Sequence, residues 1–230
     1  MDLEYGDIIV DEDLTGDGYE VRNCSVIRNS TRGMLITANN GLIENCTVDG
    51  SRSGGIIVLP EIGWAQGGYT ENLTIRNCTL KNIGSGYEGG LGIPRTASAL
   101  NISSDVDGRN HKNIVIDNNR FESNWGYDIE IANTSGAVVK NNVFGPRAEA
   151  AKNLKHGESI FVENSDNVDI KSCNKGSGDR ELYAASDCDN LKGLVPISVY
   201  PITVTDTQDG IWRYQYSPLG TNLYYDYNFC

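Results

Sequence analysis

The chain has 230 residues, among them 26 Gly, 6 Pro and 6 Cys, and its formal net charge at pH 7 is −12. This acidity disfavours nucleic acids and anionic membranes as partners, and six cysteines are too few for a disulfide-stapled scaffold. The chain contains no run of 18 apolar residues, so no membrane span is expected. The residues after Met1 show neither the basic start nor the apolar core of a signal peptide.

The first motif along the chain is acidic. The stretch DEDLTGDG, Asp11 to Gly18, places four oxygen-bearing side chains at alternate positions, which resembles the first half of a calcium-binding loop. Arg22 stands where such a loop requires its closing glutamate. We therefore expect a solvated acidic turn and no bound metal or cofactor, with Ca²⁺ as the alternative.

A six-residue pattern then recurs three times, as VRNCSV from Val21, IENCTV from Ile43 and IRNCTL from Ile75. Stacking the sequence on this pattern gives six turns, each with two short alternating segments separated by Asn, Gly or Ser corners. Such repetition predicts an all-β chain that forms a right-handed parallel β-helix, a solenoid of about six to seven coils. An antiparallel β-sandwich also has many short strands, but it does not repeat the same residues at the same phase.

The repeat predicts where its cysteines lie. In IRNCTL, Cys78 should face the interior, whereas Asn77 should form an outward corner because Asn tolerates left-handed backbone geometry. One thiol per coil cannot surround zinc tetrahedrally, so no metal is expected there. We expect Cys173 and Cys188, in the last turn, to be the pair best placed for a disulfide. The internal column should contain Cys24, Cys46, Cys78, Asn119, Asn142 and Cys173.

Carboxylates gather on the outward side of the second segment of the turns. Alignment of the turns places Glu61 and Asp105 in one outward column, Glu130 beside Ser103 in the next, and Asp128 in a third. Carboxylates one or two coils apart would be about 5 Å or about 9.6 Å apart, which brackets the separations found in glycosidases. We predict Glu61 and Glu130 as an acid/base pair, tuned by Asp105, with Asp128 nearby. The alternative is that these carboxylates form no site and are acidic only because outward strand residues face water.

Insertions between the segments could wall a groove on this face. The insertions at residues 83–98 and 145–157 come just before the carboxylate-bearing strand, and the insertion at residues 63–69 follows the other end of that strand. Their aromatic rings could stack on sugars, or could simply pack the loops against the coils. The predicted substrate-binding side chains are Trp64, Tyr69, Tyr87, Arg95, Arg109 and Trp125.

The sequence changes character near residue 191, so we predict a β-helix over residues 1–190 and a separate segment over 191–230. The tail reads as two short strands around Pro201, followed by an aromatic-rich stretch. The end of a β-helix exposes strand edges and core, which must be covered. We therefore expect the tail to cap the helix, with sugar binding by its tyrosines as the alternative.

One stretch carries a family resemblance: RGMLITANNGLIENCTVDGSRSGGIIVLPEIGWAQGGYTENLTIRNCTL, from Arg32 to Leu80. It resembles secreted right-handed β-helix proteins of the pectin lyase-like fold. It is most similar to the C-terminal half of the β-helix glycoside hydrolases that remove terminal α-galactose, the family 110 type, although Gln66 stands where Glu is more usual. The similarity spans roughly residues 18–170. It implies a carbohydrate substrate and an extracellular or cell-envelope location.

That family is longer, and its acidic catalytic residues are expected mainly in coils upstream of this stretch. The assignments made above therefore depend on spacing alone. The leading hypothesis is hydrolysis of a neutral α-galactoside. A uronate polysaccharide lyase or epimerase is the second hypothesis; it would need calcium and a basic residue such as Arg95, Arg109 or Lys112, and the net charge disfavours it. A non-catalytic glycan-binding or structural β-helix is the third.

Overall fold

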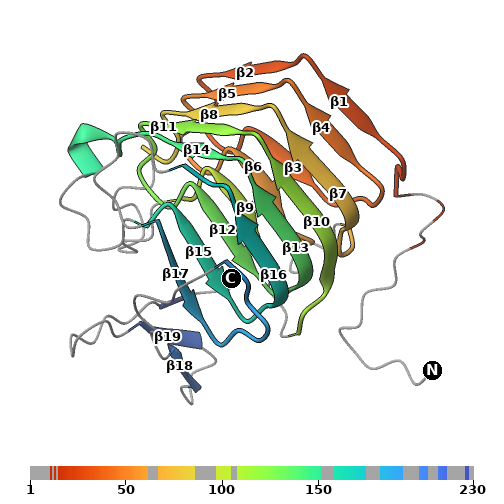
Figure 1. Ribbon diagram of the computed structural model, residues 1–230, viewed down its shortest axis with the longest axis vertical. Helices are drawn as coiled ribbons and strands as arrows, with labels where there is room; N and C mark the ends of the chain where they lie inside the picture. The colour runs from red at the N-terminus through yellow and green to blue at the C-terminus, as the bar shows by residue number, and fades with distance from the viewer. Residues whose placement is uncertain are drawn as a thin grey trace.

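The computed structural model describes residues 11, 13, 15–61, 67–85, 97–104, 108–151, 158–174 and 182–193, together with the backbone of three strands between residues 202 and 227 (Figure 1). Three parallel sheets run along the molecule, and each coil of the chain contributes a strand to each sheet in turn. This arrangement is a parallel β-helix, and it confirms the predicted fold class.

The strands fall into the three sheets in a regular sequence. The first sheet has the order β1 (Glu20–Arg22), β4 (Leu42–Glu44), β7 (Glu71–Arg76), β10 (His111–Asp117), β13 (Thr134–Lys140) and β16 (Asp166–Lys171). The second contains β2 (Ser25–Ile27), β5 (Thr47–Asp49), β8 (Thr79–Lys81), β11 (Arg120–Glu122) and β14 (Val143–Phe144). The third contains β3 (Met34–Ile36), β6 (Ile56–Val58), β9 (Leu100–Ile102), β12 (Ile129–Ala132), β15 (Ile160–Glu163) and β17 (Tyr183–Ser186).

Each coil therefore has three strands, not the two segments that the sequence pattern predicted. The Asn-Cys pattern spans a corner that separates the first sheet from the second, because its asparagine adopts left-handed backbone geometry. Asn77 has φ of 55° and is exposed, as predicted. The same corner recurs in the neighbouring coils at Asn23, Asn45, Asn118 and Asn141, with φ between 53° and 56°.

The core lies inside the coils and is built from the alternating inward side chains of all three sheets. Ile75, Leu80 and Ile102 are fully buried, and the rings of Phe121 and Phe144 stack with centroids 5.3 Å apart. Since each coil stacks on the next with a spacing of about 4.8 Å, these side chains form continuous apolar columns. These columns pack against the inner face of the third sheet and leave alternate side chains on its outer face.

The internal Cys and Asn column is confirmed from Cys46 onwards as a hydrogen-bonded ladder, whereas Cys24, which was also predicted to lie inside, is exposed in the terminal coil. The Cys46 N–H donates to Cys78 Sγ at 3.4 Å, the Cys78 N–H donates to Asn119 Oδ1 at 2.9 Å, and the Asn119 N–H donates to Asn142 Oδ1 at 2.9 Å. Burial raises the pKa of the Cys78 thiol to about 11, so this thiol stays protonated and inert at neutral pH. The ladder is structural.

The expected disulfide between Cys173 and Cys188 is wrong, because both are free thiols. Cys173 lies in the internal column after the first sheet, where its thiol is 3.7 Å from the Val139 carbonyl oxygen. Cys188 follows the third sheet and donates to the Ser186 carbonyl oxygen at 2.9 Å. The two thiols therefore occupy different corners of the coil.

Besides the strands of the coils, the structure has a 3-10 turn, η3 (Glu149–Ala151), between β14 and β15, and a small antiparallel sheet near the C-terminus. That sheet contains β18 (Ile202–Asp206), β19 (Trp212–Tyr216) and β20 (Asp226–Tyr227). Parallel pairing of the coils continues to Lys192, which bridges to Asp169, and the domain boundary at residue 190 stays a prediction. The capping role of the tail stays a prediction.

Candidate functional site

The third sheet presents a column of outward residues that changes chemistry from coil to coil. Strand register aligns Leu35 with Ile57, Ile57 with Asn101, Asn101 with Glu130, and Glu130 with Phe161. Their inward neighbours, such as Ile129 and Ile131, are fully buried in the core. The column thus runs from aliphatic, through polar, to aromatic side chains. The strands that carry it, β3 to β15, lie side by side in the third sheet (Figure 1).

Glu130 forms the polar centre of this column. Its Oε2 accepts hydrogen bonds from Ser98 Oγ at 2.5 Å and from Asn101 Nδ2 at 2.9 Å, and Asn101 Oδ1 accepts one from Ser103 Oγ at 2.6 Å. Only 7% of Glu130 is exposed. We call these four residues the Glu130 cluster. Neutral donors from the preceding coil thus fix the position of a buried carboxylate on the outer face of the sheet.

The structure corrects the predicted columns. Glu130 pairs with Asn101, not with Ser103, so the predicted alignment was displaced by two residues in this coil. Two residues along a strand correspond to about 6.6 Å. Glu61, which the sequence alignment placed next to this column, lies four positions beyond Ile57, the true column neighbour. The separation of Glu61 from Glu130 is therefore not set by the coil spacing alone.

Glu61 has a cationic partner of its own. Its carboxylate forms an ion pair with Arg32, which lies two residues before β3. The ion pair thus joins Glu61 to a residue of the preceding coil. Its predicted role as an acid or base stays a prediction, and Asp105 lies outside the described residues.

Asp128 does not face outwards as predicted. Its side chain is almost completely buried, and Asn124 Nδ2 donates to its Oδ1 at 2.8 Å. Asn124 itself lies inside the coil, where its Nδ2 also reaches the Leu80 carbonyl oxygen and its Oδ1 accepts from the Ile83 N–H. Through this hydrogen bond to Asn124, Asp128 stabilises the corner that precedes β12.

The aromatic candidates are separated by the fold. Tyr69 lies edge-on to His111, with ring centroids 5.8 Å apart, at the corner between the third sheet and the first. Trp125 lies before β12, where its carbonyl oxygen accepts a hydrogen bond from Arg147 Nε at 3.1 Å. Trp64, Tyr87 and Arg95 lie outside the described residues.

Arg109 joins coils together. Its guanidinium lies 2.8 Å from Asp189 Oδ2 and 3.3 Å from Asp166 Oδ2, and these acids belong to later coils than β10. The contacts place Arg109 at the corner that precedes the first sheet, away from the outward column of Glu130. Its predicted role in substrate binding stays a prediction, while its observed contacts are structural.

The sequence placed Tyr127 at a corner near the groove but did not show that its ring packs on Phe161. Its ring stacks on Phe161 with centroids 4.9 Å apart and an interplanar angle of 13°, and Phe161 is the neighbour of Glu130 in the outward column. The two rings are almost completely buried. Phe161 lies between the inward residues Ile160 and Val162, so it is on the outer face of the sheet and is buried there. The predicted alignment paired Phe161 with Asp128, so it could not show an aromatic wall beside Glu130.

His111 was also missed as a buried group. Its Nδ1 accepts a hydrogen bond from the Thr70 N–H at 3.1 Å, and its Nε2 lies 2.7 Å from the Ser103 carbonyl oxygen. These partners select the neutral tautomer with the proton on Nε2. Burial lowers the pKa of His111 below its ordinary value. The ring thus ties the end of β9 to the start of β10.

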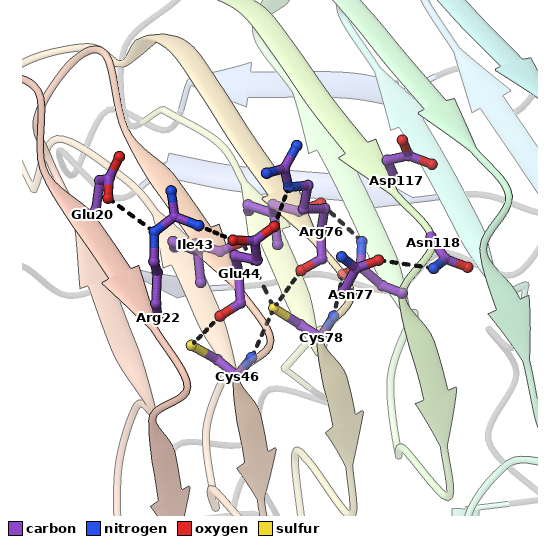
Figure 2. A network of polar contacts seen from close by, with 12 residues as sticks. Glu20, Arg22, Ile43, Glu44, Cys46, Arg76, Asn77, Cys78, Asp117 and Asn118 are labelled. Carbon is purple, nitrogen blue, oxygen red and sulfur yellow. Dashed lines mark hydrogen bonds and ion pairs between the residues drawn. The ribbon is translucent and has the colours of Figure 1, made fainter.

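The outer face of the first sheet carries a different arrangement (Figure 2). Glu44 forms ion pairs with Arg22 on one side and, at 2.6 Å, with Arg76 on the other, and Lys140 lies 3.3 Å from Asp117. We call these five residues the charge ladder, because register places them side by side in successive coils. Opposite charges neutralise one another along it, so it offers little net charge to a ligand.

Two properties bear on cofactors and membranes. In the part of the chain that the structure describes, no group of three or more His, Cys, Asp or Glu side chains is arranged to hold a metal ion. None of the described helices has the length and apolarity that crossing a bilayer requires. The predictions of no cofactor, or of Ca²⁺ as the alternative, stay predictions.

Comparison with known proteins identifies relatives of part of this chain. Alpha-1,3-galactosidase A of Bacteroides fragilis (strain ATCC 25285) is 32% identical over 129 residues, which is 54% of this chain and 20% of the relative. Alpha-1,3-galactosidase A of Bacteroides thetaiotaomicron is 28% identical over 180 residues, 74% of this chain and 28% of the relative. The chain thus spans between a fifth and just over a quarter of the length of these curated relatives.

Among solved structures, the Streptococcus pneumoniae surface protein and adhesin PfbA has a TM-score of 0.44 and 12% identity, covering 80% of this chain and 66% of that one. A second structure of PfbA gives 0.40 and 11%, over 89% and 70%. Residues 13–178 match the family described as right handed beta helix region. This match covers more than half of the chain and agrees with its three parallel sheets, and the chain therefore belongs to the right-handed β-helix family.

Proposed function

We propose that this chain is part of a carbohydrate-active protein that binds a neutral α-galactoside on the outer face of the third sheet, around Glu130. The observation that carries the proposal is the carboxylate of Glu130, held by Ser98 and Asn101 on an outward column. The similarity to alpha-1,3-galactosidase A supports the choice of sugar. The net charge of −12 supports a neutral ligand over a polyanionic one.

The chemistry proposed for Glu130 is proton transfer at a glycosidic bond. A carboxyl group in its acid form can protonate the leaving oxygen, and in its ionised form it can accept a proton from a sugar hydroxyl or from water. Its fixed position favours either role, because the donors of the Glu130 cluster hold one oxygen in place. Hydrolysis also requires a second carboxyl group, at about 5 Å for retention or at roughly 6.5–9.5 Å for inversion. Glu61 and Asp105 are the proposed sources.

A second candidate function is glycan binding without hydrolysis. The observation that favours it is the share of the relatives covered: the aligned residues make up 20% and 28% of the two galactosidases. In this case Glu130 and Asn101 would accept and donate hydrogen bonds to sugar hydroxyls, and no second carboxyl group would be needed. For either function we propose the extracellular or cell-envelope location that the resemblance implies.

The experiment is a panel of glycans incubated with the purified chain. We expect galactose release from α-1,3-galactobiose, loss of release in Glu130→Gln, and normal release in Glu122→Gln, a matched control on the second sheet. Release that persists in Glu130→Gln would contradict the proposed site. Binding of the disaccharide in calorimetry without release would select the second candidate. EDTA-sensitive cleavage of polygalacturonate, with no effect on galactosides, would select a uronate lyase instead.

A further inference from the structure

The outer face of the first sheet is a regular surface that extends over six strands, from β1 to β16 (Figure 1). Strand register arranges its side chains in rows, with one residue from each coil. The charge ladder is one of these rows, and Lys171 continues it beyond Lys140. From Arg22 to Lys140 the sign of the charge alternates, because each acid of the ladder lies between two bases. The ladder therefore repeats its charge every second coil.

A second row runs parallel to the ladder, two residues earlier in each strand. Its four middle side chains are uncharged and partly buried, and an acid stands at each end: Glu20, Leu42, Thr74, Val115, Val138 and Asp169. Glu20 forms an ion pair with Arg22 at 2.9 Å. Asp169 forms one with Lys171 at 2.6 Å. The centre of the face thus carries an uncharged stripe, and both ends carry charge pairs.

A third row lies where the longer strands of this sheet begin. Glu71 Oε1 is 2.6 Å from Lys112 Nζ in the next coil, and 42% and 54% of the two side chains are exposed. The next residue of this row, Ser135, is uncharged. Glu71 and Lys112 therefore add one pair of opposite charges at the edge of the same face.

The three rows become complementary to themselves when the order of the coils is reversed. A two-fold axis that runs along the strands, midway between β7 and β10, reverses this order and keeps each residue at the same position along its strand. Arg76 then faces Asp117 of a second copy, because register places the two residues side by side within one copy. Glu44 faces Lys140 of the second copy for the same reason. The rotation thus sets acids against bases along the ladder.

The remaining rows are matched as well. Glu71 faces Lys112 of the second copy, and the uncharged stripes of the two copies meet. At the ends of the ladder Arg22 faces Lys171, and both are bases. The terminal acids of the second row lie two residues, or about 6.6 Å, from these bases along the strand. Acidic and basic groups are therefore close together at the ends of the face too.

This position of the axis is favoured over its neighbours. An axis along a strand would set each residue of that strand against itself, so that Arg76 would face Arg76. An axis one coil away in either direction would leave four of the six strands in contact. The net charge of −12 opposes the close approach of two copies in general, whereas acids and bases nearly balance in these three rows.

We propose that the outer face of the first sheet binds the same face of a second copy of this chain about this two-fold axis, which makes the protein a dimer. Six strands and six residues per strand, at spacings of about 4.8 Å and about 3.3 Å, give about 600 Å² on each copy, or about 1,200 Å² in all. This area is at the lower end of the range for specific interfaces, so we expect a dissociation constant on the order of 10–100 µM. The Glu130 cluster lies on the third sheet, outside this interface.

A matched pair of threonines tests which face forms the dimer. Thr74 lies on the outer face of the first sheet and Thr79 on the outer face of the second sheet, in the same coil, and both are partly buried. Thr74→Glu brings two carboxylates together near the axis, so the dimer dissociation constant in sedimentation should rise about tenfold or more. Thr79→Glu should leave it unchanged. Equal effects of the two variants, or a wild-type chain that is monomeric at about 1 mM, would overturn the proposal.

The third row supplies a test of the register between the copies. Glu71→Lys and Lys112→Glu each set like charges against one another across the interface, so each variant alone should dimerise about tenfold more weakly than the wild type. An equimolar mixture of the two variants should form heterodimers with about wild-type affinity, because each contact then joins an acid to a base. Raised NaCl should reduce these differences, since salt screens them. A mixture that associates no more tightly than the separate variants would overturn the proposal.

Discussion

The outer faces of the first and third sheets use their carboxylates in opposite ways. On the first sheet, Glu44 is held between the guanidinium groups of Arg22 and Arg76, so its charge is balanced by residues of the neighbouring coils. On the third sheet, Ser98 and Asn101 donate hydrogen bonds to Glu130. The ion pairs of Glu44 join neighbouring coils, whereas proton transfer is the role that we propose for Glu130.

The largest expected effect separates the two faces by activity. Glu130→Gln should reduce galactoside turnover by about 100-fold or more, the usual contribution of a general acid or base, with little change in stability because the amide can still accept from Ser98 and Asn101. Glu44→Gln should leave turnover unchanged. Turnover numbers for both variants, alongside urea unfolding, check this contrast. Equal losses of turnover in the two variants would contradict it.

Stability should show the reverse order. Glu44→Gln removes the charge that both flanking arginines contact, so we expect the free energy of unfolding to fall by about 1–3 kcal/mol. The loss should shrink as NaCl is raised, because salt screens the wild-type pairs. Urea denaturation at low and high salt measures this. Glu20→Gln, an exposed acid paired with Arg22 at 2.9 Å, serves as control and should give a smaller shift; an equal shift would argue against a special role for Glu44.

A smaller effect on activity is expected from the neighbour of Glu130. Asn101→Ala removes one of the donors that position the carboxylate, so we expect turnover to fall by about tenfold, equivalent to one charge-assisted hydrogen bond. The corner residue Asn118→Ala, far from the third sheet, is the matched control. Steady-state kinetics on both variants would sharpen the comparison, and undiminished turnover in Asn101→Ala would remove Asn101 from the site.

The smallest effect concerns the link between the two sheets. Because burial lowers the pKa of His111, the unfolded chain binds a proton at higher pH than the folded chain does. Stability is therefore complete above the ordinary pKa of 6.5 and should fall as the pH drops below it. His111→Gln should flatten this dependence between pH 7.5 and 5.5, with His156→Gln as control. Identical pH profiles for wild type and His111→Gln would refute the link.

Much of the coil was predictable because its signal is local and repeated. The six-residue pattern around Cys78 fixed which residues face inwards, and the left-handed corner at Asn77 followed from one residue type. The third strand per coil was missed because the corner interrupts the pattern itself. Side-chain alternation shows which residues of a strand face inwards and which face outwards, but it does not show where one sheet ends and the next begins.

The candidate site was less predictable because it depends on register between coils. Loops of different length precede β9 and β12, so a displacement by two residues preserved the inward phase and yet moved Glu130 from Asn101 to Ser103. The charge ladder was missed for a related reason. Its partners lie 22 and 32 residues apart along the chain, as Arg22 and Arg76 do from Glu44, and only an exact register brings them together.

The most direct test of the central claim is to map where α-1,3-galactobiose binds, by chemical-shift perturbation in the full chain. The account predicts that the disaccharide perturbs the resonances of Ser98, Asn101 and Glu130 and leaves those of Arg22, Glu44 and Arg76 unchanged. Perturbation centred on the first sheet, or none at millimolar sugar, would contradict it.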